Sequence, residues 1–285
     1  MDVRKFRSIT RQAAGSATSD GAGVRLKRII GTNELNVLDP FLLLDEFLSD
    51  NPQDYIAGFP DHPHRGFETV TYMLAGRIRH KDNAGHEGVI EAGGVQWMTA
   101  GSGIIHSEMP EQQDGLMWGF QLWINLPAAE KMNKPGYREY TQDQIPCEDH
   151  DNDVKIKVIA GTTSSGTSGP VLNVSTRPVF FDIALPSSTE LTEQIPEDFN
   201  AFIFVYSGVI TVTGDNQQPV TAGKGTLSII ENGDGIRLNS SHGGAKILLI
   251  AARPLNEPIV RAGPFVMNTR AQINQAFEDY NQGRF

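Results

Sequence analysis

The sequence predicts an all-β protein built from two similar antiparallel β-barrels or sandwiches, and three observations support this fold class. Most segments alternate with a period of two residues, which is typical of strands rather than helices. Gly and Pro contribute 29 and 16 of the 285 residues, which indicates many turns. Two stretches in different halves of the chain also share one pattern of strands and glycine turns. Short strands at such spacing are typical of barrels and sandwiches.

Predicted strands follow one another along the chain. In the first half, residues 67–74 (FETVTYML) and 117–126 (MWGFQLWINL) are rich in β-branched and aromatic residues. Alternation places one set of apolar side chains of the second segment on a single face: Trp118, Phe120, Leu122, Ile124 and Leu126. In the second half, four segments behave alike: 202–206, 209–213, 226–230 and 246–251.

Helical signals are few. The best lies near the C-terminus, where Thr269 and Gln272 fit a capping box and Gly283 ends the pattern. Between them, Ile273, Phe277 and Tyr280 form one apolar stripe. A second short helix is expected over residues 127–133 (PAAEKMN).

A weak internal repeat predicts the domain organisation. Residues 72–79 (YMLAGRIR) resemble residues 205–212 (VYSGVITV), because each has a strand, a glycine turn and another strand. Residues 90–106 resemble residues 220–236 in the same way. Two copies of one β-unit fit the length of the chain.

The expected boundaries follow from this repeat. We expect an N-terminal barrel over residues 1–140 and a connecting segment over 141–170, in which the stretch SSGTSG should be a mobile loop. A C-terminal barrel over 171–285 should end in the predicted helix.

Composition narrows the class of protein. Twenty-four basic against 34 acidic residues give a formal charge of −10, which argues against direct nucleic-acid binding but leaves open binding to a DNA-bound partner. The single cysteine, Cys147, excludes an intrachain disulfide and a cysteine-rich zinc site, and it favours a reducing compartment. No apolar run approaches the roughly 18 residues of a membrane helix, and residues 1–15 lack the apolar core of a secretory signal. We expect a cytoplasmic protein without a membrane segment.

Histidines cluster in the first half of the chain. His62 and His64 form an H-x-H pair, and His106 with Glu108 repeats the spacing with a carboxylate. Alternate residues of a strand share a face, so each pair can reach one ion. Three neutral imidazoles and one carboxylate predict a site for one divalent first-row metal, and Fe(II), Mn, Ni, Cu and Zn all suit these ligands.

The carboxylate ligand has a rival in Glu68. Glu68 lies four residues after His64, so an unbroken strand would put both on one face. Its alternative role is an ion pair with Arg65 or Arg79. Arg65 could instead hold a carboxylate or an anionic substrate, or form a surface salt bridge.

The other histidines are expected to lie outside the site. His80 and His86 flank the turn KDNAG and should be exposed. His150 lies among acidic residues and should be solvated, and His242 lies in a Ser/Gly-rich loop.

Several runs resemble the pirin family of the cupin superfamily, in the right order and spacing. They are LDPFLLLDEF (38–47), FPDHPHRGFETVTYMLAGRIRHKD (59–82), GVQWMTAGSGIIHSEMP (94–110), GFQLWINLP (119–127) and GPFVMNT (263–269). The resemblance implies a bicupin, with two jelly-roll-like barrels and a metal in the first only. It places the family's ligand positions on four residues: His62, His64, His106 and Glu108. In many other cupins a glutamate at the position of Glu68 ligates instead.

The second half lacks equivalent ligands under the repeat alignment. His62 and His64 fall near Gln194 and Pro196, and His106 falls near Ile236. None of these side chains replaces an imidazole, so the C-terminal barrel is expected to be structural or to provide another binding surface.

The resemblance also implies a function. Pirins typically bind Fe(II), and several resemble quercetin 2,3-dioxygenases, which open the flavonol ring with O₂. The flavonol would bind through its 3-hydroxyl group, and Glu108 is the candidate base for that proton. Apolar residues that could form the substrate slot, or equally the barrel core, are Phe59, Phe67, Met73, Trp97, Met98, Met109 and Trp123.

Two other classes remain open. Pirins also resemble redox-responsive regulators that bind a transcription factor or a metabolic enzyme without turnover. A cupin that binds a small acid is the third reading.

Overall fold

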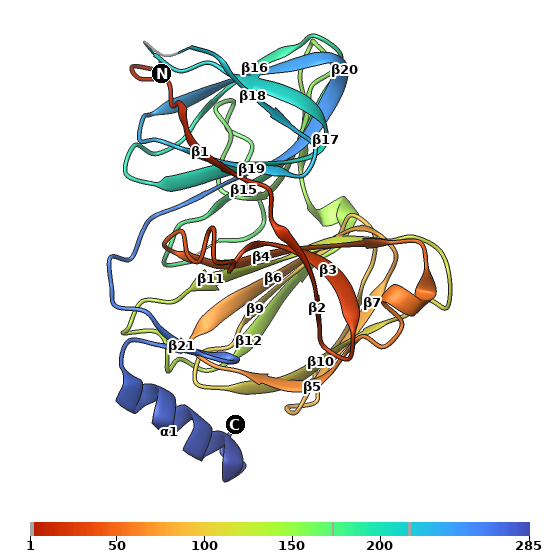
Figure 1. Cartoon of the computed structure of the whole chain (residues 1–285), viewed down its shortest axis with the longest axis vertical. Helices are drawn as coiled ribbons and strands as arrows, with labels where there is room; N and C mark the ends of the chain where they lie inside the picture. The colour runs from red at the N-terminus through yellow and green to blue at the C-terminus, as the bar shows by residue number, and fades with distance from the viewer. Residues whose placement is uncertain (1–2, 173, 216–217) are drawn as a thin grey trace. The chain divides into compact units, whose positions relative to one another are not determined.

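The computed structural model describes residues 3–172, 174–215 and 218–285. The chain divides into two compact units, unit 1 with Met1–Gly15 and Asp143–Pro254, and unit 2 with Ser16–Gln142 and Leu255–Phe285. Each unit is built from antiparallel strands (Figure 1), which confirms the predicted all-β class with two β-domains. In the part of the chain that the structure describes, no helix has the length and apolarity that a membrane crossing requires.

Both chain ends depart from the predicted domain boundaries. Strand β1 (Ile9–Ala13) pairs with β19 (Thr226–Ile230), so the N-terminal segment belongs to the unit that contains most of the second half. Helix α1 (Arg270–Asn281) contacts β21 (Val260–Ala262) and β22 (Phe265–Met267) in unit 2. The prediction treated each domain as one continuous segment. Long-range strand pairing and packing instead place the N-terminal segment in unit 1 and the C-terminal helix in unit 2.

Unit 2 contains two main antiparallel sheets. The order in the larger sheet is β12-β9-β6-β11-β4-β3-β2, and in the smaller sheet β5-β10-β7-β8. Figure 1 shows β4, β11, β6 and β9 side by side. The strands are β2 (Ser16–Asp20), β3 (Val24–Ile30), β4 (Phe41–Ser49), β5 (Phe59–His64), β6 (Phe67–Ala75), β7 (Ile78–Asp82), β8 (Glu87–Ile90), β9 (Val95–Thr99), β10 (Ile104–Pro110), β11 (Met117–Asn125) and β12 (Gly136–Tyr140).

Unit 1 contains a nine-stranded antiparallel sheet. Its main path is β1-β19-β17-β20-β15-β14-β13, with β16 paired to β20 and β18 paired to β17. Its core is apolar and includes fully buried Ile156, Phe181, Ile203 and Leu249. The strands not yet given are β13 (Cys147–Asp149), β14 (Lys155–Ala160), β15 (Val179–Leu185), β16 (Glu190–Gln194), β17 (Asn200–Val212), β18 (Val220–Gly223) and β20 (Gly235–Ala252).

The predicted repeat has a structural counterpart in each unit. In unit 2, β6 pairs with β9, and β7 pairs with β8 and β10. In unit 1, the single strand β17 pairs with β19, β18 and β20. Gly76 separates β6 from β7 at φ +83°, and Gly208 lies at φ +73° beside a register shift within β17. A positive φ is readily reached only by glycine, which explains why both copies place glycine there.

The helix predictions had mixed outcomes. Helix α1 begins with the predicted capping box, in which the N-cap residue Thr269 and Gln272 of the first turn bond reciprocally. The helix expected over 127–133 is wrong, because this segment forms hydrogen-bonded turns. There, the buried Lys131 ammonium donates to the carbonyl oxygens of Gly66 and Val266, which holds the short segment by tertiary contacts. Two 3₁₀ turns, η1 (Pro52–Asp54) and η2 (Gln142–Gln144), were not predicted.

The segment containing SSGTSG forms a hydrogen-bonded turn. Within it, Thr163 N–H donates to Thr167 O, and Gly166 N–H donates to Thr163 O. Gly169 N–H donates to Gly161 O and closes the loop at its base. The sequence predicts a mobile loop here, because it shows the small polar residues but not these bonds.

Candidate metal centre

The structure brings three of the predicted ligands together. Strands β5 and β10 pair so that His106 lies opposite His62, while His64 lies opposite Ile104. One ring nitrogen from each of His62, His64 and His106 lies within 4.8 Å of the other two. The alternation of side chains along each strand and the pairing of the strands produce this convergence.

Two of these imidazoles are buried without sufficient hydrogen-bond partners. His64 and His106 are 3% and 1% exposed. Nδ1 of His64 and both ring nitrogens of His106 have no partner. A buried polar atom without a partner is costly, so these nitrogens fit a site that takes a cation.

The protonation state of the imidazoles also suits metal binding. The pKa of His106 is lowered to about 4, chiefly by burial, while Glu108 opposes this decrease and neighbouring His62 adds to it. Burial lowers the pKa of His64 well below its usual value. Only neutral imidazoles can donate a lone pair to a metal.

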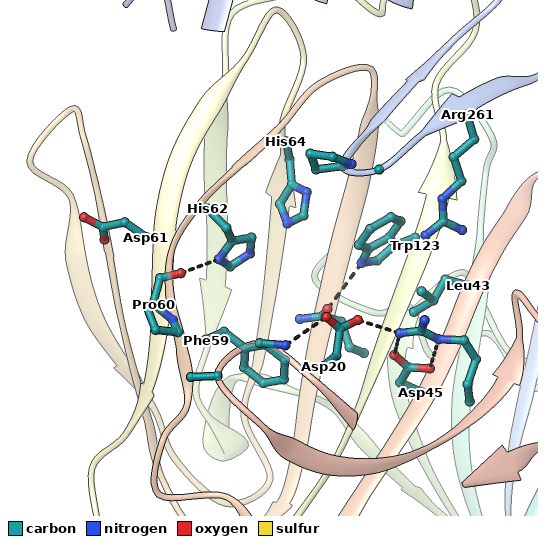
Figure 2. Close-up of a pocket in the computed structure, with 16 residues that line it drawn as sticks. Asp20, Leu43, Asp45, Phe59, Pro60, Asp61, His62, His64, Trp123 and Arg261 are labelled. Atoms are coloured by element: carbon teal, nitrogen blue, oxygen red, sulfur yellow. Dashed lines mark hydrogen bonds and ion pairs between the residues drawn. The ribbon is translucent and has the colours of Figure 1, made fainter. Parts of the chain in front are cut away.

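The third imidazole is oriented by the backbone. Nδ1 of His62 lies 2.8 Å from the carbonyl oxygen of Pro60, as Figure 2 shows. A carbonyl can only accept, so this bond places the proton on Nδ1 and leaves Nε2 with its lone pair free for a ligand role.

Glu108 lies beside this group but is held differently. It follows His106 by two residues in β10 and is buried. Its Oε1 accepts from Thr71 Oγ at 2.9 Å, and its Oε2 accepts from Gln121 Nε2 at 2.8 Å. These donors come from β6 and β11 of the opposite sheet and keep the carboxylate in one orientation.

Glu68 faces another direction. The strand expected to join it to His64 is broken, because β5 ends at His64 and Gly66 adopts φ +89° before β6 begins. The ring of Phe67 lies 5.1 Å from that of His64, whereas the Glu68 carboxylate accepts from Thr99 Oγ at 2.7 Å. Burial raises the pKa of Glu68. The expectation that Glu68 shares a face with His64 is therefore wrong.

The remaining first-half histidines differ from each other. His80 is buried, contrary to the prediction, because β7 turns it inward, where its Nε2 lies 2.5 Å from Glu139 Oε1. Its ring also packs against Tyr137, with 5.3 Å between centroids. His86 is exposed as predicted, with Nδ1 2.8 Å from Asp82 Oδ2.

A pocket of about 600 Å³ adjoins the histidine group. His62 and His64 point toward it (Figure 2). The aromatic rings of Phe59 and Trp123 also line it. The other lining residues are Asp20, Gly21, Ala22, Arg28, Leu43, Asp45, Pro60, Asp61, Gln121, Arg261, Gly263 and Pro264.

Most of the predicted slot residues have another role. Phe67, Met73, Trp97 and Met98 are completely buried and belong to the core, whereas Phe59 and Trp123 reach the pocket. Met109 is half-buried and does not line the pocket either.

Two arginines of the pocket were not predicted. Arg261 stacks on Trp123 with 4.7 Å from Cζ to the ring centroid, and burial lowers its pKa. Arg28 donates two hydrogen bonds to Asp45, at 2.9 and 2.7 Å. Both lie far in sequence from the H-x-H pair, so no motif connects them with the site.

Arg65 does not reach the pocket. Its side chain is buried and donates to Asp279 of α1 at 2.6 Å and to the carbonyl oxygen of Ser102. Its guanidinium also lies over the ring of Phe285, with 4.3 Å from Cζ to the ring centroid. The surface salt bridge considered from the sequence is therefore a buried ion pair that anchors the end of β5 to the C-terminal helix.

The comparisons with known proteins agree with this architecture. Residues 23–124 match the pirin family model, and residues 180–285 match that of the pirin C-terminal cupin domain. A pirin-like protein from Caulobacter vibrioides is 52% identical over 279 residues, which cover 98% of this chain and 99% of its own. A Pseudomonas aeruginosa protein named "Putative quercetin 2,3-dioxygenase" is 46% identical over 284 residues, 99% of each chain.

A solved structure extends the comparison to the fold. The crystal structure of a quercetin 2,3-dioxygenase from Acinetobacter baumannii matches with a TM-score of 0.89 at 32% identity and covers 98% of both chains. Two β-domains, one with a convergent histidine group, define this molecule as a two-domain cupin protein. The family matches then identify it further, and the chain belongs to the pirin family.

Proposed function

We propose that this chain is an Fe(II)-dependent dioxygenase that opens the central ring of a flavonol with O₂, in the manner of a quercetin 2,3-dioxygenase. The observation that carries the proposal is the convergence of three buried or half-buried imidazoles beside an aromatic-walled pocket. The names of the Pseudomonas and Acinetobacter relatives support the reaction class.

The proposed ligands are His62, His64, His106 and Glu108. The unpartnered ring nitrogens and the lowered pKa values of His64 and His106 fit a divalent ion of this kind. Zn, Mn, Ni and Cu suit the same donors. Bound iron would supply Lewis acidity toward the substrate oxygen and the redox chemistry with O₂.

Glu108 is the proposed base for the flavonol 3-hydroxyl proton. Its carboxylate is fixed by Thr71 and by Gln121, and Gln121 itself lines the pocket. A base that is already oriented loses little freedom when it takes the proton.

The pocket walls would hold a flat, anionic ring system. Phe59 and Trp123 provide apolar surfaces for stacking. Arg261 lies over Trp123 and adds positive charge, whereas the charge of Arg28 is balanced by Asp45 and Asp20. The flavonolate formed by proton loss is therefore expected to bind near Arg261.

The proposed location is the cytoplasm. Its reducing conditions would keep the iron ferrous and the exposed Cys147 thiol free.

Turnover of quercetin tests the function. The protein is loaded with Fe(II) without oxygen and mixed with quercetin, and the flavonol absorbance is followed under air. We expect the absorbance to decay in air, but not without oxygen and not with His106→Ala. Metal-loaded protein that leaves quercetin unchanged would contradict the enzyme and favour the regulatory class.

A pair of matched variants tests the base. Glu108→Gln should lower turnover by about 10²-fold or more and change its pH dependence. Glu68→Gln alters a carboxylate that is equally buried and also bonded to a threonine, and it should leave both unchanged. An unaltered pH profile in Glu108→Gln would remove Glu108 from this role.

A further inference from the structure

A second group of candidate metal ligands lies in unit 1. Glu148 belongs to β13, His150 follows that strand, and Glu193 belongs to β16. One ligand atom from each of the three lies within 4.8 Å of the other two. The sequence predicts that His150 is solvated because its neighbours are acidic. In the structure it belongs to this group instead.

Both carboxylates are oriented by one turn. Oε2 of Glu148 accepts from the hydroxyl of Thr163. Oε2 of Glu193 accepts from the N–H and the hydroxyl of Ser164, each at 2.9 Å. Consecutive residues thus hold one oxygen of each carboxylate and leave the other oxygen, Oε1, without such a bond.

The remaining ligand atoms are unsatisfied. Glu193 is completely buried, and its Oε1 has no hydrogen-bond partner. Nε2 of His150 lies 2.7 Å from Oε1 of Glu148, but neither atom makes a hydrogen bond of acceptable geometry. A buried carboxylate oxygen that faces a second carboxylate without a donor is costly unless a cation or a proton lies between them.

We propose that Glu148, His150 and Glu193 form a second metal site, which takes a divalent cation such as zinc. Imidazole nitrogen and carboxylate oxygen are ordinary zinc ligands, and three protein ligands leave one tetrahedral position for water. Two carboxylates balance the charge of the ion. The side chain of His150 is 25% exposed, which provides a route of entry.

The site does not follow from the repeat. The positions that align with the unit 2 histidines fall near Gln194, Pro196 and Ile236, and on this basis the second half is expected to lack ligands. Glu148 and His150 instead come from the segment expected to connect the two barrels. The proposal is independent of the dioxygenase function, because it concerns residues of unit 1 alone.

Zinc stoichiometry of the whole chain tests the proposal. The protein is stripped with chelator and dialysed against zinc, and bound zinc is measured by elemental analysis and by calorimetric titration. A background variant, His62→Ala/His64→Ala/His106→Ala, removes the unit 2 group. We expect this variant to bind one zinc ion per chain. Adding His150→Ala or Glu193→Gln should weaken that binding by about tenfold or more.

Controls distinguish the site from surface binding and from misfolding. Glu190→Gln removes an exposed carboxylate from the same strand as Glu193 and should leave zinc binding unchanged. His150→Ala changes a partly exposed side chain, so circular dichroism should show a folded chain even if the buried Glu193→Gln variant unfolds. Cobalt should give a visible d–d band in the background variant that disappears with His150→Ala. A triple-histidine variant that binds no zinc, or binds it equally well with His150→Ala, would overturn the proposal.

Discussion

At the scale of single residues, the histidine group combines burial with neutrality. A metal site needs deprotonated imidazoles, and burial holds the pKa values of His64 and His106 below that of an exposed histidine. The same burial leaves their nitrogens without partners when no ion is bound. The metal-free protein should therefore be sensitive to acid.

We expect the metal-free protein to lose stability as pH falls from about 6.5 toward 4. In this range a histidine of the unfolded chain takes up a proton, whereas His106 in the folded chain, with a pKa of about 4, does not. The difference amounts to about 2 kcal/mol at pH 5 for this side chain. Urea unfolding at pH 7 and pH 5, followed by tryptophan fluorescence, measures it.

The variant His106→Asn is the control for this effect, because it removes the titrating group. Its unfolding free energy should depend less on pH than that of the parent chain. Equal pH dependence in the two proteins would mean that His106 is not the source.

At the scale of elements, long-range contacts attach both chain ends to strands distant in sequence. Arg7, just before β1, is completely buried and donates to carbonyl oxygens of Phe199, Glu231 and Gly233. Burial lowers its pKa to about 10, so it remains charged at neutral pH. These bonds link the N-terminal segment to the loops of unit 1.

Arg7→Met should destabilise unit 1 by about 4 kcal/mol, because several buried carbonyl groups lose a charged donor. All three tryptophans, Trp97, Trp118 and Trp123, lie in unit 2, so tryptophan fluorescence should report little change. Circular dichroism should show the loss. Arg4→Met is the control, because the Arg4 side chain is 79% exposed and surface pairs contribute little. If Arg7→Met lowered the stability seen by tryptophan fluorescence as much as the stability seen by circular dichroism, the assignment of Arg7 to unit 1 would be contradicted.

Asp279 makes the corresponding attachment in unit 2. The neighbouring Arg284 and Arg65 guanidinium groups hold the pKa of its carboxyl far below the usual value. Asp279→Asn leaves Arg65 buried without its anion, and we expect a loss of about 2 kcal/mol in the tryptophan-detected unfolding free energy. Iron affinity should also fall, because Arg65 directly follows His64. Glu278→Gln, on the same helix but exposed, should have neither effect.

At the scale of the whole molecule, the two units repeat part of one strand-pairing pattern but bury different polar groups. Unit 2 holds three convergent histidines beside Glu108, whereas unit 1 has an apolar core and, separately, the group of Glu148, His150 and Glu193. Ligands that bind only the folded state stabilise it. Iron binding in the proposed centre should therefore appear in the tryptophan signal.

Fe(II) at about 100 times its dissociation constant should raise the unfolding free energy of unit 2 by about 2.7 kcal/mol. Anaerobic thermal unfolding, followed by tryptophan fluorescence, measures the rise in Tm, and a chelator should reverse it. His106→Ala should show no shift. A shift of equal size in that variant would place the iron elsewhere.

Much of the fold can be predicted from short-range patterns. Alternation identifies β6, β11 and β19 almost to the residue, and the capping box at Thr269 marks the start of α1. The H-x-H and H-x-E spacings indicate which side chains share a face. These features depend on residues that are close in sequence, so they can be predicted from the sequence alone.

Other features depend on which strands meet. Glu68 does not share a face with His64, because the strand is interrupted at Gly66. His80 is buried because β7 turns it inward beside Tyr137. Gly66 marks a position where a positive φ is possible, but the sequence does not show that the strand breaks there. The burial of His80 has no local signal, since its packing partner is a consequence of the assembled sheets.

Local residue order thus determines the strands, the C-terminal helix and which residues of each H-x-H or H-x-E pair share a face, whereas the pairing of β5 with β10 brings the three imidazoles together. Tertiary pairing decides which unit receives each chain end, which carboxylates face a ligand group, and that Glu148, His150 and Glu193 meet. The physical reason is range: a periodic pattern acts over a few residues, whereas burial and convergence require segments that are distant in sequence to pack together.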